Sequence, residues 1–525
     1  MVVYLDRLIP TPMRRTVAGG PQRIQSARFK LAHSHCQIRQ VFVVSLLTTV
    51  RIIAIYLAIG FLVFTVTTLG ILILYPYAPD PGFSSILSES SLLGAPLSVI
   101  LLFGVLYGWT LSAARRVIVC LSCWIPSLSP SARLLGGIRS KQASEPPESL
   151  DILSTLPRPV FLLGISLAAG IFLAWIPYRP DLNPTGGLIG IDTGIYVDWI
   201  ARMLSLPPAQ AVAYSFVGGL NGSRPLVLLT LYMVCLGGNS PSFTIQILPL
   251  FLAPSLSLAV YVFVYFGKGD VRLAGLTSLF TPFSYYLTTA MWGGYYANWL
   301  ALVIGFLFLA CLLRQSRSPT RVKYLVAIVL LSTILFLTHP WTWLLFASAS
   351  AAFEFSLWFD TRRTPHALSL VGIVLPGVLL DYVKTLVFST PSVVLDLTTK
   401  ISVGGSVVEF WSLTVDGLLY THSGLLANWL FMGLALVSSF AKSVRGSFER
   451  LLMFWVTAGS VSFLFLDGYN KARLVFDLPI PILGAMGAVV LLQRVGSGNV
   501  LLARLFFVGV LTLAGAYALQ STLLL

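Results

Sequence analysis

The sequence predicts an all-α membrane protein, a polytopic bundle of transmembrane helices, and three observations indicate this fold class. Hydrophobic residues make up 56% of the chain and charged residues only 10%. The apolar residues gather in repeated runs of about 17 to 25 residues, the length that a helix needs to cross hydrocarbon. The sequence lacks the short alternating strands of an outer-membrane barrel, so helices remain the way to satisfy the backbone in lipid.

Thirteen apolar segments are the candidate spans. A further apolar stretch, 226–236, is shorter. If it crossed the membrane, the basic segments 314–323 and 360–363 would fall outside the cell, so we expect it to dip into the outer leaflet or lie along it. The thirteen predicted spans are Ile52 to Tyr75, Leu92 to Ala113, Val160 to Pro177, Phe243 to Phe266, Leu273 to Ala290, Trp299 to Leu313, Tyr324 to Thr338, Trp343 to Phe359, Ala367 to Phe388, Gly424 to Phe440, Leu451 to Leu466, Pro479 to Gln493 and Val500 to Gln520.

The basic residues indicate how these spans are oriented. The net charge is +15, and most of the 34 Lys and Arg residues fall in segments that this topology makes cytoplasmic. Retention of positive residues on the cytoplasmic side explains such a bias. The basic excess therefore needs no nucleic-acid partner, and no aromatic-interleaved basic module is present. The basic residues predicted to lie outside are Arg179, Arg202, Arg224, Lys400, Lys471 and Arg473.

The chain is predicted to have four parts. Residues 1–51 form a basic cytoplasmic tail without the apolar core of a signal peptide, and residues 52–113 form a two-helix preamble. Residues 114–158, rich in Ser, Pro and Gly, form a cytoplasmic linker. Residues 159–525 form the main transmembrane domain, in which a large outer loop containing short interfacial helices follows the third span.

The first candidate functional residues lie in this outer loop, within IGIDTGIYVDWIARM (189–203). It places two aspartates, Asp192 and Asp198, among large apolar side chains. Asp192 can act as the N-cap of a short interfacial helix, and Asp198 can form an ion pair with Arg202 four residues on. The spacing is equally compatible with these structural roles and with catalytic ones.

Several segments together resemble a known family. In GIDTGIY, an acidic residue in the first large outer loop is followed closely by a tyrosine. The segment GSRPLVLLTLYMV then opens a helix, and GGNSPSF and a long span come after it. The next outer turn is TTAMWGGYYANWLAL. This order resembles the GT-C group of integral-membrane glycosyltransferases, which use polyprenyl-phosphate-linked sugars and include oligosaccharyltransferases and protein O-mannosyltransferases. The resemblance covers most of the chain from Val160 onward.

The resemblance implies a GT-C-like domain over 159–525 and a glycosyltransferase activity on the outer face of the membrane. A sugar would pass from a polyprenyl-phosphate donor to an acceptor protein, glycan or lipid, in a single displacement with inversion at the sugar carbon. This chemistry requires a base for the acceptor and neutralisation of the leaving phosphate. Asp192 is the expected base because it matches the family element, and Asp198 is the second candidate.

Two further outer turns supply candidates for binding the donor. LTHPWTW places His339 at the outer end of a span, and DGYNKARLVFDLPIPIL places Lys471 and Arg473 before a Pro-rich span. Guanidinium can hold phosphate through paired, charge-assisted hydrogen bonds, so Arg473 is the preferred phosphate ligand, with Lys471 and His339 beside it. Alternatively, Arg473 is an interfacial arginine paired with Asp467 or Asp477.

Aromatic and amide side chains in the same turns are expected to line the substrate site: Tyr196, Trp292, Tyr295 and Asn298. In the related oligosaccharyltransferase segment, Gly-Tyr-Tyr precedes a pair of aspartates, whereas Ala297 and Asn298 stand in those places here. A divalent cation favours clustered anionic oxygens, and no second acidic motif supplies them. The sequence therefore predicts no metal ligand and no definite cofactor, and a divalent cation stays an open alternative that no second acidic motif supports.

Two other classes of function stay open: a carrier or flippase for lipid-linked precursors, and a noncatalytic membrane subunit with a decayed GT-C site. A carrier should have polar residues distributed through its spans, whereas the acidic groups outside the cytoplasm gather in loops, which favours an enzyme. Asp381 and Lys384 lie within a span and are expected to pair, with a place along a substrate path as the alternative. We expect a multi-pass protein of the cell membrane with a cytoplasmic N-terminus and an extracellular or luminal site, whose partners are the lipid-linked donor, the acceptor and membrane lipids.

Overall fold

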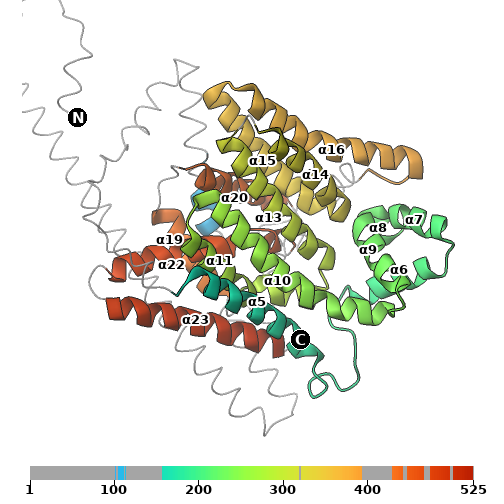
Figure 1. The fold of residues 1–525 in the computed structure, drawn as a ribbon, viewed down its shortest axis with the longest axis horizontal. Coiled ribbons are helices and arrows are strands. Elements are labelled where there is room, and N and C mark those ends of the chain that lie inside the picture. The colour runs from blue at the N-terminus through green and yellow to red at the C-terminus, as the bar shows by residue number, and fades with distance from the viewer. Residues whose placement is uncertain are drawn as a thin grey trace, which may run out of the picture. The chain divides into compact units, whose positions relative to one another are not determined.

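The computed structural model describes residues 157–318, 321–392, 428–441, 446–465, 473–496, 500–523 and 525, together with part of 101–113 (Figure 1). Every regular element in this part of the chain is a helix, which confirms the all-α prediction. All of these residues belong to one unit, Phe64–Leu525. The predicted tail, the first predicted span and nearly all of the predicted linker lie outside the described residues.

Five of the described helices are long and apolar enough to cross a membrane. On α16, the side chains of Tyr382, Leu386 and Val387 are all more than 60% exposed, an outward apolar face that fits contact with lipid. These features fit a membrane protein. The five helices are α5 (Pro159–Trp175, extended by the 3-10 turn η3, Ile176–Tyr178), α10 (Pro241–Lys268), α13 (Tyr296–Arg317), α16 (Thr364–Phe388) and α23 (Val500–Leu523).

The remaining helices are shorter or less apolar. Those that correspond to predicted spans begin and end within a few residues of the predicted boundaries, with one exception described below. α9 corresponds to the ambiguous stretch 226–236, and its 12 residues are too few to cross the hydrocarbon core. These helices are α6 (Thr193–Leu204), α7 (Pro208–Val217), α8 (Gly219–Gly222), α9 (Pro225–Leu236), α11 (Val271–Phe283), α12 (Tyr285–Gly293), α14 (Val322–Thr338), α15 (Pro340–Thr361), α19 (Asn428–Ala441), α20 (Ser447–Phe465) and α22 (Ile480–Gly496).

The exception is the predicted span 273–290, which the structure divides into α11 and α12. The backbone of Ser284 is extended between the two helices, and its hydroxyl accepts a hydrogen bond from the main-chain N–H of Tyr286. Pro282 precedes the break and has no N–H to continue the helical ladder. An apolar run shows no such break, so the prediction of one continuous helix was wrong. The break gives α12 its own direction toward the candidate site.

α5, α10 and α11 lie side by side and are joined by small and hydroxyl-bearing residues (Figure 1). The Ser166 hydroxyl donates to the carbonyl of Ser278 at 2.6 Å, and the Ser278 hydroxyl donates to the carbonyl of Ser257 at 2.9 Å. A Cβ on Gly170 would lie 3.4 Å from Ala253, so the backbones of α5 and α10 approach closely. Such contacts are typical of helices packed within membranes.

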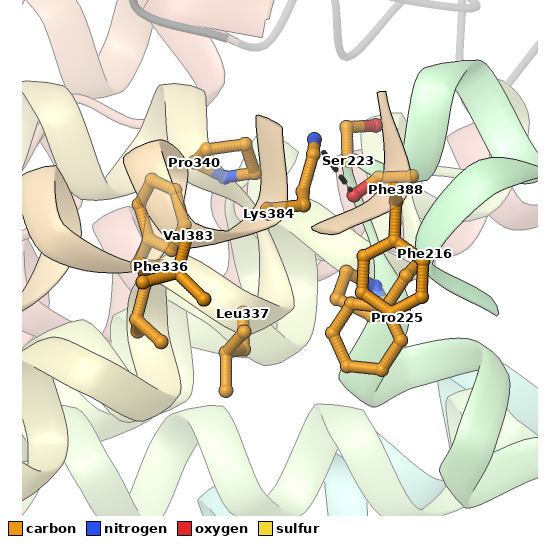
Figure 2. Close-up of a pocket in the computed structure, with 11 residues that line it drawn as sticks. Phe216, Ser223, Pro225, Phe336, Leu337, Pro340, Val383, Lys384 and Phe388 are labelled. Carbon is orange, nitrogen blue, oxygen red and sulfur yellow. Dashed lines mark hydrogen bonds between the residues drawn. The ribbon is translucent and has the colours of Figure 1, made fainter. Parts of the chain in front are cut away.

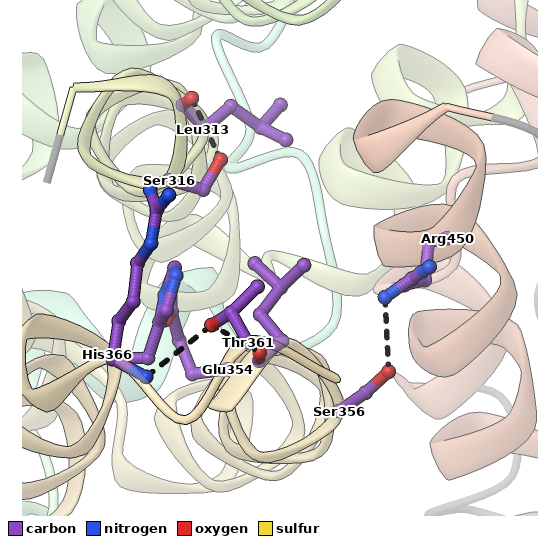
Figure 3. A network of polar contacts seen from close by, with 9 residues as sticks. Leu313, Ser316, Glu354, Ser356, Thr361, His366 and Arg450 are labelled. Carbon is purple, nitrogen blue, oxygen red and sulfur yellow. Dashed lines mark hydrogen bonds and ion pairs between the residues drawn. The ribbon is translucent and has the colours of Figure 1, made fainter. Parts of the chain in front are cut away.

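A second group of polar contacts lies where α15 ends and α16 begins (Figure 3). Nδ1 of His366 lies 2.7 Å from Oε2 of the buried Glu354. Arg450 at the start of α20 forms a 2.7 Å ion pair with Asp360 and a hydrogen bond to Ser356. α15 runs from this group to the candidate site, which lies at its N-terminal end.

Candidate functional site

The loop before α6 is fastened to the turn between α12 and α13 by main-chain hydrogen bonds. The N–H of Ile191 donates to the carbonyl of Trp292 at 2.9 Å, and the N–H of Asp192 donates to the carbonyl of Gly293 at 3.2 Å. The segments GIDTGIY and WGGYY, far apart in the sequence, therefore meet. Their contact fixes the position of the Asp192 carboxylate.

Two glycines permit this close approach. Gly190 and Gly294 have φ angles of +100° and +66°, in the left-handed region that favours glycine. A Cβ on Gly190 would lie 2.4 Å from the carbonyl oxygen of Met291, and a Cβ on Gly294 would lie 3.0 Å from the backbone nitrogen of Asp192. Larger residues at these positions would separate the two segments.

Asp192 forms a largely buried ion pair with Arg473. Nη2 of Arg473 donates to Oδ2 of Asp192 at 2.8 Å, and the two side chains are 13% and 12% exposed. Asp192 does stand at the N-cap of α6, but its carboxylate makes no capping hydrogen bond. The interpretation of Asp192 as a capping residue was therefore wrong. Its carboxylate compensates a guanidinium instead, as a charge held out of water requires.

Three tyrosines hold the segment that carries Arg473. The guanidinium carbon of Arg473 lies 4.9 Å from the ring centroid of Tyr295, close enough for a cation–π interaction. The hydroxyls of Tyr285 and Tyr286 both donate to the carbonyl of Leu478, at 3.2 and 2.5 Å. Because both tyrosines belong to α12, the break at the start of this helix also positions the arginine.

A second carboxyl group, that of Asp477, lies one helical turn after Arg473. Asp477 is 4% exposed, and its Oδ2 accepts a 2.8 Å hydrogen bond from the Thr342 hydroxyl. Burial raises the pKa of Asp477 to about 7, although the hydrogen bond from Thr342 and the charge of Arg473 both favour the ionised form. This carboxyl group therefore gains and loses its proton near neutral pH.

Thr342 connects Asp477 to two residues singled out in the sequence. The Thr342 hydroxyl lies 2.9 Å from Nδ1 of His339 and accepts a 3.3 Å hydrogen bond from Nδ2 of Asn298. His339 and Asn298 are each 1% exposed. The ends of α13 and α15 and the segment before α22 thus share one buried polar network.

Aromatic side chains of α6 and α13 pack together beside the segment that carries Asp192. Tyr196 is fully buried, and its ring packs edge-on against Tyr296 with the centroids 5.7 Å apart. The Tyr296 hydroxyl lies 2.9 Å from Oγ1 of Thr193. On its other side, Tyr196 accepts a 2.5 Å hydrogen bond from Nη1 of Arg224. The predicted lining residue Tyr196 is therefore next to the ion pair.

Not every predicted residue joins this cluster. Asp198 lies on the exposed face of α6, and the structure shows no ion pair between Asp198 and Arg202. Arg202 lies over the ring of Tyr214 instead, 5.4 Å from its centroid. Trp292 contributes its main-chain carbonyl to the loop contact described above. Lys471 lies outside the described residues.

A pocket opens between α9, α16 and the junction of α14 with α15 (Figure 2). Its walls are mainly apolar, and Phe216 and Phe388 stack there with their rings 5.0 Å apart. Ser223 and Pro225, the neighbours of Arg224 in the chain, line it as well. The pocket is therefore mainly apolar, and it borders the segment that carries Arg224.

Lys384 contributes the charged group of this pocket. Its ammonium group donates to the carbonyl of Asn221 at 3.0 Å and to that of Gly222 at 3.3 Å. Figure 2 shows the second of these bonds. The expected ion pair with Asp381 is not formed, and Asp381 accepts a hydrogen bond from the hydroxyl of Ser392. The α8 turn folds against α16, so its carbonyls reach Lys384. The three-residue spacing of Asp381 and Lys384 could not indicate this contact.

The sequence reasoning missed three contributors to the site. Thr342 and Tyr296 resemble any polar residue at a helix end, so nothing in the sequence marks them. Arg224 did carry a signal, because it is a lone charge at the start of the apolar run GSRPLVLLTLYMV. In the structure Arg224 is only 2% exposed, so this lone charge does mark a buried residue.

Comparisons with known proteins add no assignment. No protein-family model matches the chain, and a search of curated proteins gives no significant match. Within the described part of the chain, no group of three or more His, Cys, Asp and Glu side chains could hold a metal ion. The chemistry of the site therefore has to follow from its own residues: a carboxylate, a guanidinium and a second carboxyl that titrates near neutral pH.

Proposed function

We propose that the protein is a membrane glycosyltransferase of the GT-C type, which transfers a sugar from a polyprenyl-phosphate donor to an acceptor protein, glycan or lipid. One observation supports the proposal: Asp192, the base that the resemblance implies, and Arg473, the preferred phosphate ligand, are joined by a 2.8 Å ion pair. A base and a phosphate ligand act on opposite sides of one anomeric carbon, so this chemistry requires both in one site, and the donor would separate the pair when it binds.

In the proposed reaction, the Asp192 carboxylate takes the proton of the acceptor group. The acceptor atom forms a bond to the anomeric carbon while the bond from that carbon to the phosphate oxygen breaks. The electron pair leaves with the phosphate, and Arg473 stabilises its negative charge by charge-assisted hydrogen bonds. The single displacement inverts the configuration of the sugar carbon.

The proposal puts this site at the extracellular or luminal face of the cell membrane. Its support is the distribution of basic residues, because the helix ends opposite the site are rich in arginine and cytoplasmic ends retain positive charge. The N-terminus would then be cytoplasmic. The arginines at those opposite ends are Arg314, Arg317, Arg362, Arg363 and Arg450.

The test is sugar transfer by purified protein in lipid nanodiscs, with synthetic polyprenyl-phosphate sugars as donors. Asp192→Asn removes the base and keeps a similar shape, and we expect turnover to fall by about 10²- to 10⁴-fold. Asp181→Asn is the matched control, because Asp181 is an exposed outer-loop aspartate that also pairs with an arginine, Arg179. Unchanged turnover in Asp192→Asn would remove the catalytic assignment.

The same preparation separates the competing functions. If the parent protein transfers no sugar from any donor but moves fluorescent lipid-linked precursors across the bilayer, it is a carrier or flippase. If it does neither and binds no donor, it is a noncatalytic subunit. Each of these results contradicts the proposed transferase.

A further inference from the structure

Arg224 is a buried cation that forms no ion pair with an acidic side chain of the described residues. The residue is 2% exposed, and its Nε is buried without a hydrogen-bond partner. Its contacts are with Tyr196, whose hydroxyl accepts from Nη1 and whose ring centroid lies 5.4 Å from the guanidinium carbon. No carboxylate of the described residues lies within ion-pair distance of it. A charge held in this way costs free energy unless a ligand compensates it.

Tyr196 links this cation to the candidate site. Burial raises the pKa of Tyr196, while the nearby charges of Arg224 and Arg473 lower it and that of Asp192 raises it. The two guanidinium groups and the carboxylate therefore act on the same hydroxyl. Arg473 has Asp192 as its counterion, whereas no carboxylate of the described residues pairs with Arg224, so the excess positive charge lies at Arg224.

We propose that Arg224 binds the second phosphate of a diphosphate-linked donor, with the sugar-bearing phosphate at Arg473. This inference rests on the proposed function and specifies its substrate class: a polyprenyl diphosphate sugar rather than a monophosphate one. A diphosphate diester carries two negative charges, one for each guanidinium. Guanidinium groups suit phosphate because their donors can form paired hydrogen bonds with its oxygens.

The pocket beside Arg224 indicates how the diphosphate donor would be oriented in the site. Ser223 and Pro225 line the pocket and flank Arg224, and the stacked rings of Phe216 and Phe388 lie in its wall (Figure 2). A donor whose distal phosphate is at Arg224 would lead its first isoprene units into this apolar space. The sugar, at the other end of the diphosphate, would then lie beside Asp192.

The two arginines also suit the chemistry of a diphosphate leaving group. When the bond between the anomeric carbon and the phosphate oxygen breaks, its electron pair adds one negative charge to the lipid diphosphate. The acceptor proton moves to Asp192, so charge balances without another reactant. Arg473 meets the new charge directly, and Arg224 holds the phosphate beyond it.

The test is binding of two probes, a synthetic polyprenyl monophosphate and the diphosphate of the same chain length, to purified protein in nanodiscs. We expect the parent protein to bind the diphosphate at least about tenfold more tightly. Arg224→Gln, which keeps a partner for the Tyr196 hydroxyl, should remove most of this preference, and Arg224→Lys should keep part of it. Arg202→Gln, which changes an arginine stacked on another tyrosine, should leave the preference unchanged.

The outcomes separate this inference from the proposed function. Equal binding of both probes by the parent, or the same preference in Arg224→Gln as in the parent, overturns the inference even if transfer still depends on Asp192. Failure of the parent to bind either probe overturns the proposed function as well. Unfolded protein reduces the binding of both probes by the same fraction, so the ratio of the two affinities is insensitive to a partly unfolded sample. The melting temperature without ligand should not fall in Arg224→Gln, because the substitution removes an uncompensated buried charge.

Discussion

The carboxylate of Asp192 and the guanidinium of Arg473 are joined by a 2.8 Å hydrogen bond although 281 positions separate them in the sequence. Because both side chains are largely buried, neither charge can return to water when its partner is removed. The pair is therefore important to the fold as well as to the proposed chemistry. The two contributions can be measured separately.

Arg473→Gln should lower the free energy of unfolding by about 3 kcal/mol, because it leaves the Asp192 carboxylate buried without its counterion. The double variant Asp192→Asn/Arg473→Gln should lose at least about 1 kcal/mol less than the two single losses added together, because it leaves no unpaired charge. Denaturation in mixed micelles measures all three variants. Additive losses would show that the two side chains do not interact.

The exposed pair Arg179–Asp181 provides the control for this cycle. Its side chains are 39% and 57% exposed, so water solvates either charge when the other is removed. Arg179→Gln should change the free energy of unfolding by less than about 1 kcal/mol. A similar loss for the exposed and the buried arginine would contradict the explanation based on burial.

The parts of the fold that a bilayer dictates could be predicted from the sequence. Helices such as α10 and α16 follow from apolar length alone, because hydrocarbon leaves the backbone no other partner. Asp192 and Arg473 could be singled out for a related reason, because charges beside apolar runs cost free energy and therefore indicate a functional role. The family resemblance gave Asp192 the expected role of base, and the affinity of guanidinium for phosphate gave Arg473 the expected role of phosphate ligand.

The contacts between segments could not be predicted in this way. The burial of Arg224 depends on Tyr196, whose position follows from the docking of the α6 loop. The spacing of Asp198 and Arg202 favoured an ion pair, but packing placed Arg202 over Tyr214. Tertiary contacts decided each of these cases.

Gly190 offers a test of the contact between the two loop segments. Gly190→Ala should destabilise the protein by more than about 1 kcal/mol and reduce donor binding, because its φ is +100° and the new Cβ would meet the Met291 carbonyl at 2.4 Å. Gly194→Ala is the matched control, since a Cβ there meets nothing within 4 Å. Within helix α6, this control should be neutral or stabilising by up to about 1 kcal/mol. Equal effects of the two substitutions would argue against the close approach.

The raised pKa of Asp477 predicts how the free energy of unfolding changes with pH. Its pKa is raised from 3.8 to about 7, so between these values the folded state binds more protons than the unfolded state. The contribution of this group is fully present below pH 4 and is lost as the pH rises toward 7. Asp477→Asn should remove this part of the pH dependence, which melting temperatures between pH 4 and 8 would measure. A parent and a variant with parallel profiles would exclude Asp477 as the titrating group.

Thr342 should tune that titration. Its hydroxyl donates to the Asp477 carboxyl at 2.8 Å and thereby favours the ionised form, so Thr342→Val should raise the pKa of Asp477 further and move the stability transition to higher pH. Thr342→Ser keeps the hydroxyl and should leave the transition where it is. Valine also removes the contacts of this hydroxyl with His339 and Asn298, so overall stability should fall in Thr342→Val. The position of the transition distinguishes the two effects, because a loss of packing alone lowers the whole profile without displacing it along the pH axis.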